Sequence, residues 1–147
     1  MTGAVPPKFH GLHHIGVVVR DARAAAERLR PLGLEVFAWE DYGPGLLRIA
    51  FVHLGGVLLE LIEPLTTDGF NAEWLRRRGE GIQHIALLVD DIYTALAALK
   101  ARGMALRDKT PQPGAGNTLI AFLAHDPSDG FLVELTQPRD GAGDRSP

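Results

Sequence analysis

The sequence predicts an α+β protein built from two copies of a βαβββ module. The phrase GLHHIGVVVRDA at residues 11–22 returns in modified form as GIQHIALLVDDI at residues 81–92. The same series of expected elements follows each of these two segments. Each series ends with a similar strand, VLLELIEP in the first copy and FLVELTQP in the second. A unit that recurs in this way predicts two structurally equivalent modules.

Each module opens with a strand and a helix. Residues 12–19 and 82–89 are apolar and rich in β-branched side chains, as a strand requires. An aspartate that can cap a helix follows each strand, and a glycine that can end the helix follows the apolar helical positions. These residues are Asp21 and Gly33 in the first copy, and Asp90 or Asp91 and Gly103 in the second.

Three further strands complete each module. The candidates are residues 34–39, 46–54 and 57–62 in the first copy, and 105–108, 118–124 and 131–136 in the second. Turn-forming sequences separate them, such as Tyr42-Gly-Pro-Gly45 and Asp126-Pro-Ser-Asp-Gly130. We therefore expect a flexible N-terminus (1–10), a first module (11–64), a linker with a short helix (65–80), a second module (81–138) and a flexible C-terminal tail (139–147).

Composition excludes several classes of function. The chain has 147 residues, a net charge of -3 and 22% charged residues, which is ordinary for a globular protein and favours neither a nucleic-acid nor a membrane partner. The absence of cysteine excludes disulfides, thiolate nucleophiles and zinc-thiolate sites. No secretory leader or membrane span is expected, so a cytoplasmic location is the prediction.

Two histidines and two glutamates occupy equivalent places in the two copies. His14 aligns with His84 at an offset of 70 (84 minus 14), and Glu60 aligns with Glu134 at an offset of 74 (134 minus 60). The four extra residues fit a longer hairpin loop in the second copy. Because alternate side chains of a strand share a face, each of the four points with apolar neighbours.

This set of four predicts a metal site. An ionised carboxylate on an apolar face costs several kcal/mol unless it is paired or coordinated. If the two modules assemble with pseudo-twofold symmetry, their first and last strands can bring all four side chains to one point. Two imidazoles and two carboxylates suit a borderline-to-hard divalent cation and leave room for exchangeable ligands.

The remaining polar candidates indicate structural roles. His10, His13 and His53 lie outside the repeat correspondence, and we expect them to be surface or packing residues. The three arginines at 76–78 fit a solvated end of the linking helix. The Gly114-Ala-Gly116 loop lacks the strand-to-helix context of a dinucleotide site, and no serine sits on a nucleophile elbow.

The sequence resembles the vicinal oxygen chelate superfamily and, within it, the methylmalonyl-CoA epimerases. The resemblance is carried by LHHIGVVV, VLLELIEPL, RRRGEGIQHIALLVDDIYTALAALKARG and GAGNTLIAFLAHDPSDGFLVELTQP, which cover most of residues 11–138. It implies paired βαβββ modules that form an open β cup around one divalent ion, and commonly a homodimer. His14, His84 and Glu134 match metal ligands, and Glu60 matches the remaining one, which is glutamine in some epimerases and glutamate in glyoxalase I-like members.

The resemblance also implies a reaction. In these epimerases a divalent ion, typically cobalt, binds the thioester and carboxylate oxygens of methylmalonyl-CoA, and the α-proton is removed and returned on the other face. Mn, Ni, Zn or Mg would also suit these ligands. Glu134 is one expected acid/base. The second is expected near AWEDYGPGLL, where Glu40 or Asp41 can serve, although this loop is longer than in the family.

Other departures from the family concern substrate contacts. The first helix reads AERLRP, and the late strand ends Leu123-Ala-His-Asp-Pro127, so His125 is not equated with the family histidine. Alternative functions are therefore a glyoxalase I-like lyase or a biosynthetic isomerase or cyclase on the same scaffold. A metal-free binding or resistance protein fits less well because all four ligand-type residues are present, and an extradiol dioxygenase would use only one carboxylate.

Overall fold

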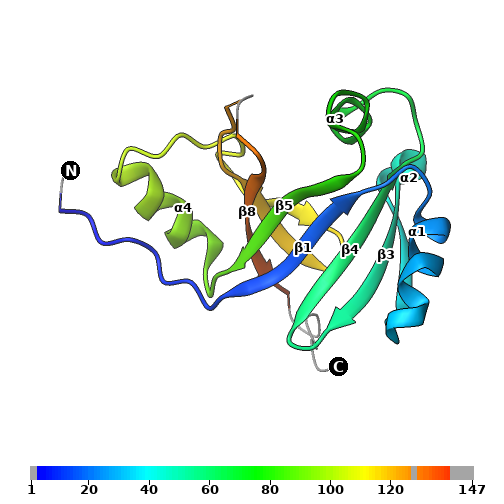
Figure 1. Ribbon diagram of the computed structural model, residues 1–147. Helices are drawn as coiled ribbons and strands as arrows, with labels where there is room; N and C mark the ends of the chain where they lie inside the picture. Colours follow the sequence, from blue (N-terminus) through cyan, green and yellow to red (C-terminus); the bar gives the residue numbers. More distant parts are fainter. Residues whose placement is uncertain (1–2, 127–128, 140–147) are drawn as a thin grey trace. The chain divides into compact units, whose positions relative to one another are not determined.

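The computed structural model describes residues 3–126 and 129–139 of the chain (Figure 1). These residues form two compact units, residues 14–83 and residues 84–139 with the N-terminal segment 3–13. Most of the predicted C-terminal tail, residues 140–147, and two residues of the expected turn at 126–130 lie outside the described residues. No helix in the described part of the chain has the length and apolar character that crossing a membrane requires.

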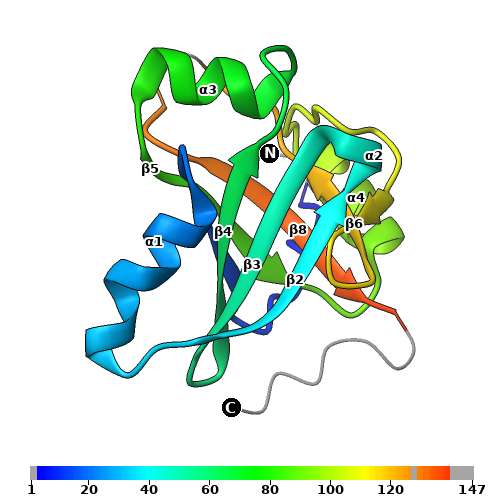
Figure 2. The ribbon, with the colours of Figure 1, turned by 90° about the vertical axis from the view of Figure 1, so that its right-hand side faces the viewer.

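The first module follows the predicted βαβββ order. Its elements are β1 (Leu12–Val18), α1 (Ala22–Leu29), the 3-10 turn η1 (Arg30–Leu32), β2 (Val36–Tyr42), α2 (Gly43–Leu46), β3 (Leu47–Leu54) and β4 (Val57–Pro64). Strand β4 pairs parallel with β1 and antiparallel with β3, and β3 pairs antiparallel with the edge strand β2. Figure 2 shows β4, β3 and β2 side by side in that order. The linking helix α3 (Phe70–Arg78) follows, as predicted.

The second module repeats this arrangement. Its elements are β5 (Gly81–Leu88), α4 (Ile92–Ala101), β6 (Gln112–Gly114), β7 (Thr118–Phe122) and β8 (Leu132–Pro138). Strand β8 pairs parallel with β5 and antiparallel with β7, which pairs antiparallel with β6. The prediction of an α+β protein with two βαβββ modules is therefore confirmed.

The two modules begin their helices in the same way. The carboxylate of Asp21 accepts hydrogen bonds from the backbone N–H groups of Arg23 and Ala24 at 3.0 and 3.1 Å. Asp91 accepts from Tyr93 and Thr94 at 2.9 and 3.2 Å, so Asp91 rather than Asp90 is the cap of α4. These bonds satisfy N–H groups that have no partner inside the helix.

A second side chain supports each helix start from the closing strand. The Oε1 atom of Glu63 accepts a hydrogen bond from the N–H of Ala22 at 2.9 Å, and the Oε1 atom of Gln137 accepts one from the N–H of Ile92 at 2.9 Å. Glu63 and Gln137 follow Glu60 and Glu134 by three residues, so the repeat extends into side-chain contacts that tie the last strand to the helix.

Each helix packs on one face of its own sheet, which we call the helix face. Helix α1 buries Ala22 and Ala25 against Ala50 and Leu61. Helix α4 packs against β7 and β8 in a larger cluster of buried side chains: Val89, Ile92, Ala95, Leu96, Leu99, Ala121, Leu123 and Leu135. Because neighbouring residues of a strand point to opposite faces, Glu60 and Glu134, beside Leu61 and Leu135, point away from the helices.

One predicted strand is wrong. Residues 105–108 do not form a regular strand. One isolated bridge joins Leu106 to Leu123, and the N–H groups of Arg107 and Asp108 both donate to the carbonyl of Phe122 at 3.1 Å. The side chain of Asp108 accepts a hydrogen bond from the N–H of Phe122 at 2.8 Å, in place of the backbone carbonyl that a strand ladder would use. The strand that pairs with β7 is instead β6, a three-residue segment at 112–114.

The N-terminal segment makes defined contacts within its unit. The backbone of His10 and Gly11 pairs with Leu88 at 2.9 Å, and the His10 ring lies 2.8 Å from the carboxylate of Asp90. Near the chain start, the Arg102 guanidinium donates to the carbonyl of Ala4 at 2.5 Å. The N-terminal segment therefore belongs to the same compact unit as the second module. The exact boundaries of the two modules remain a prediction from the sequence.

The arginines of α3 lie at a solvated helix end, as expected. Arg76 and Arg77 both hydrogen bond to Glu73, with an Arg77 Nε to Oε1 distance of 2.6 Å. The hydrogen bond from Arg77, and then that from Arg76, holds the pKa of Glu73 below its ordinary value. Arg78 lies over the ring of Trp74 at 4.0 Å from the centroid.

Candidate metal and active site

The first module carries a buried histidine–glutamate pair. In the parallel ladder of β1 and β4, His14 is opposite Leu58 and Gly16 is opposite Glu60, so His14 and Glu60 share a face. Both residues are 4% exposed, and His14 Nδ1 lies 3.3 Å from Glu60 Oε2. We call the sheet face that bears such a pair the histidine face of its module.

The second module carries the equivalent pair. His84 is opposite Leu132 and Ala86 is opposite Glu134 in the ladder of β5 and β8. His84 and Glu134 are each 3% exposed, and His84 Nε2 lies 3.7 Å from Glu134 Oε1. The ring of Phe122 meets the ring of His84 edge-on, with 5.5 Å between centroids.

A buried hydroxyl holds the second oxygen of Glu134. Thr136 is fully buried, and its Oγ1 donates a hydrogen bond to Glu134 Oε2 at 2.6 Å. A distance this short is typical of a hydroxyl that donates to an ionised carboxylate. The sequence does not by itself reveal this role, although the two-residue spacing of Thr136 and Glu134, which sets both on one strand face, was the available signal.

The donor chemistry of the two pairs fits a divalent cation. A buried carboxylate requires a positive partner or strong hydrogen bonds, and each module sets an imidazole nitrogen within 4 Å of such a carboxylate. Imidazole nitrogen and carboxylate oxygen together suit Zn, Mn, Co, Ni or Mg, and the chain has no cysteine that would select a softer metal.

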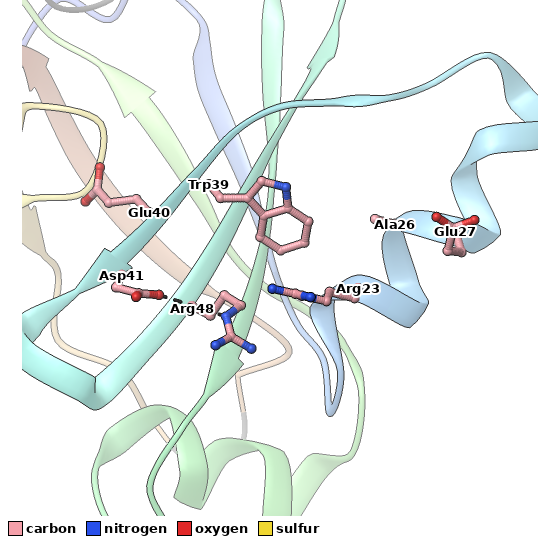
Figure 3. Close-up of a pocket in the computed structure, with 7 residues that line it drawn as sticks. All are labelled: Arg23, Ala26, Glu27, Trp39, Glu40, Asp41 and Arg48. Carbon is pink, nitrogen blue, oxygen red and sulfur yellow. Dashed lines mark ion pairs between the residues drawn. The ribbon is translucent and has the colours of Figure 1, made fainter.

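Glu40 and Asp41 lie on opposite faces of β2. Both belong to the strand, which runs through Tyr42, rather than to the loop in which the sequence placed them. Glu40 is opposite Ile49, which is opposite Ile62 in β4, so Glu40 shares the histidine face with Glu60. Asp41 is opposite Arg48 on the helix face, and Figure 3 shows the Glu40 side chain pointing away from Asp41 and Arg48.

The structure gives packing contacts to the other histidines. His13 is 3% exposed, and the ring of His53 stacks on Phe37 with 3.9 Å between centroids. His125 Nδ1 lies 3.7 Å from the carboxylate of Asp129. The burial of His13 and the stacking of His53 agree with the expectation that these two are packing residues.

The sequence is similar to several known proteins over most of its length. The uncharacterized protein YqjC of Bacillus subtilis is 38% identical over 131 residues, which cover 87% of this chain and 92% of that protein. The ethylmalonyl-CoA/methylmalonyl-CoA epimerase of Cereibacter sphaeroides is 35% identical, with 86% of this chain and 96% of that protein covered. A probable lactoylglutathione lyase of Synechocystis is 34% identical over 72% of this chain and 78% of its own length.

The fold agrees with these relatives. A variant of the Streptomyces coelicolor methylmalonyl-CoA epimerase, solved in complex with 2-nitronate-propionyl-CoA, superposes with a TM-score of 0.82 at 29% identity and covers 89% of this chain and 96% of that one. The predicted fold class is thereby confirmed. A family model also matches residues 13–122. The chain therefore belongs to the glyoxalase/bleomycin resistance protein/dioxygenase superfamily.

Proposed function

We propose that this protein is a metal-dependent epimerase that works through an enolate, with methylmalonyl-CoA or a similar acyl thioester as substrate. The observation that carries the proposal is the buried histidine–glutamate pair found at equivalent positions of both modules. The likeness to epimerases over nearly the whole chain supports the same reaction class.

The proposed metal ligands are the members of the two pairs, His14, Glu60, His84 and Glu134, which would together hold one divalent ion. When bound, the ion supplies a Lewis acid that stabilises the negative charge developing on the enolate oxygen. Within its module each glutamate is held close to its histidine on a buried face, which limits the conformations that it must lose on coordination.

Epimerisation needs a proton acceptor and a proton donor on opposite faces of a planar intermediate. One carboxylate takes the α-proton, the electron pair of the C–H bond moves into the enolate, and an acid on the other face returns a proton to the same carbon. We propose Glu134 for one role and Glu40 for the other. Glu40 is favoured over Asp41 because only Glu40 shares the histidine face of its module.

Three further predictions belong to this proposal. The partner is a small molecule, an acyl-CoA, in keeping with the 2-nitronate-propionyl-CoA bound to the Streptomyces coelicolor enzyme. A homodimer and a cytoplasmic location are predicted from the family resemblance and the composition. Sedimentation of the purified protein measures the oligomeric state, and fractionation of the source cells measures the location.

A glyoxalase I-like lyase is the second candidate. The observation that favours it is Glu60, because the family resemblance associates glutamate at this position with glyoxalase I-like members and glutamine with some epimerases. The similarity to a probable lactoylglutathione lyase supports the same alternative. Both reactions pass through an enolate next to a thioester or thiohemiacetal carbon, so the same four ligands serve either.

Incubation of the metal-loaded protein with methylmalonyl-CoA in deuterated water tests the proposal. We expect deuterium to enter at the α-carbon at a rate that depends on protein concentration, and Glu134→Gln to abolish it. Parallel incubation with the hemithioacetal of methylglyoxal and glutathione measures the lyase. Absence of α-deuterium with the metal fully loaded would reject the epimerase, and formation of lactoylglutathione would establish the alternative.

A further inference from the structure

A cavity of about 490 Å³ lies between α1 and the strands β2 and β3 of the first module. It opens on the helix face of the sheet, and Glu40 also belongs to its lining although the Glu40 side chain shares the opposite, histidine face with Glu60. Figure 3 shows that its side chains come from both layers, with Arg23 and Glu27 on the helix and Trp39, Asp41 and Arg48 on the strands. Its volume falls in the range of sites for small molecules.

Trp39 gives the cavity an aromatic platform. It is one of only two tryptophans in the sequence, and it is 47% exposed whereas Trp74 is 6% exposed. The neighbouring strand residue opposite Trp39 is the small, fully buried Ala50, so packing of the sheet does not require a large ring here. An exposed indole with one accessible face can stack a planar ligand ring.

Two arginines line the cavity, and they differ in whether a carboxylate lies beside them. The carboxylate of Glu27 lies 3.4 Å from the guanidinium of Arg30, and that of Asp41 lies 3.9 Å from the guanidinium of Arg48. Arg48 also lies 3.9 Å from Glu63. Among the described residues, Arg23 has no carboxylate partner, and its guanidinium lies over the Trp39 ring at 5.9 Å from the centroid.

We propose that this cavity binds a purine nucleotide phosphate, with the base stacked on Trp39 and the phosphate paired with Arg23. Arginine binds phosphate through several N–H donors in one plane, and aromatic side chains stack on any base. Two sources share this chemistry: the phosphorylated adenosine of coenzyme A, and a free adenine nucleotide. The proposal concerns binding at the helix face and does not rest on the proposed epimerase activity.

Calorimetric titration of the full-length protein with coenzyme A and, separately, with AMP tests the proposal. We expect saturable binding of at least one probe, weakened about tenfold or more by Trp39→Ser and by Arg23→Gln. Arg28→Gln removes an exposed arginine of the same helix that does not line the cavity, and it should bind as the wild type does. Trp39→Phe keeps a stacking ring and should retain most of the affinity.

The two probes distinguish the source of the ligand. Binding of coenzyme A but not of AMP assigns the cavity to the nucleotide end of an acyl-CoA, whereas binding of AMP with similar affinity shows that the base and one phosphate suffice, so free nucleotides are ligands as well. Circular dichroism of each variant confirms that it is folded. The proposal is overturned if neither probe binds, or if binding by folded Trp39→Ser and Arg23→Gln equals that of the wild type.

Discussion

Removal of the Thr136 hydroxyl probes how Glu134 is held in its buried position. Thr136→Val keeps the shape of the side chain but deletes the donor that lies 2.6 Å from Glu134 Oε2. Thr136 is 0% exposed and Glu134 is 3% exposed, so water cannot replace the lost hydrogen bond without a rearrangement of the core. We therefore expect both the stability of the fold and the affinity for a divalent ion to fall.

The magnitude follows from the charge of the acceptor. A hydrogen bond to an ionised group contributes roughly 1.5–3 kcal/mol, about twice as much as one between neutral groups. Thr118 provides a matched control because it is 1% exposed and donates to the neutral carbonyl of Ala115 at 3.0 Å. We expect Thr136→Val to lower the free energy of unfolding by about 2 kcal/mol and Thr118→Val to lower it by about 1 kcal/mol.

Urea denaturation of the metal-free proteins, followed by circular dichroism, measures both losses. At a typical slope of roughly 2 kcal/mol per molar urea, the midpoint of Thr136→Val should lie about 1 M below that of the wild type. Metal titration should show an affinity about 10- to 100-fold weaker, as for other groups that orient a ligand. The reasoning is refuted if Thr136→Val matches the wild type, or if Thr118→Val is destabilised equally.

Three further predictions test the fold and the acid/base assignment. Asp21→Ala and Asp91→Ala should each lower the free energy of unfolding by about 1 kcal/mol, with additive losses in the double variant, because each removes the cap of a separate helix; urea midpoints that do not move would contradict this. Leu135→Ala, at a fully buried position, should cost about 3 kcal/mol in the same assay, whereas Leu32→Ala at a 72% exposed position should cost less than about 0.5 kcal/mol. Glu40→Gln should slow α-deuterium exchange about 100-fold or more, whereas Asp41→Asn, on the opposite face, should exchange at nearly the wild-type rate; the reverse order would assign the second base to Asp41.

Much of the fold could be predicted because the sequence contains the same series of strands and helix in two copies. The strand–helix openings, the capping aspartates and the closing strands recur in both copies, so each copy checks the interpretation of the other. Strand alternation alone also placed each of the four metal-ligand candidates on an inward face of its sheet, and the structure confirms that all four are buried.

The two errors, at residues 105–108 and at Glu40 and Asp41, have different physical causes. A strand was predicted at 105–108, but the Asp108 carboxylate takes the N–H of Phe122 that a strand partner would use. The family resemblance implies that Glu40 or Asp41 lies in a loop, yet β2 continues through both residues to Tyr42 and the short helix α2 makes the turn. Propensity alone does not reveal how far a strand extends toward a turn, since the partner strand decides it.

The cavity beside Trp39 could not be inferred from the sequence. Arg23 and Trp39 are 16 residues apart (39 minus 23) and meet only because α1 packs on the face of β2 and β3 to which Trp39 points. The helix position and the strand phase are each predictable, but the distance between a helix side chain and a strand side chain depends on tertiary packing.

Metal titration of the purified protein, with His14→Ala and His84→Ala as paired variants, tests the central claim most directly. If the two histidine–glutamate pairs hold one shared ion, the wild type binds one divalent ion per chain, and each variant loses this binding although it changes only one module. Two ions per chain, no ion at all, or full binding by a folded His14→Ala protein would contradict the shared site.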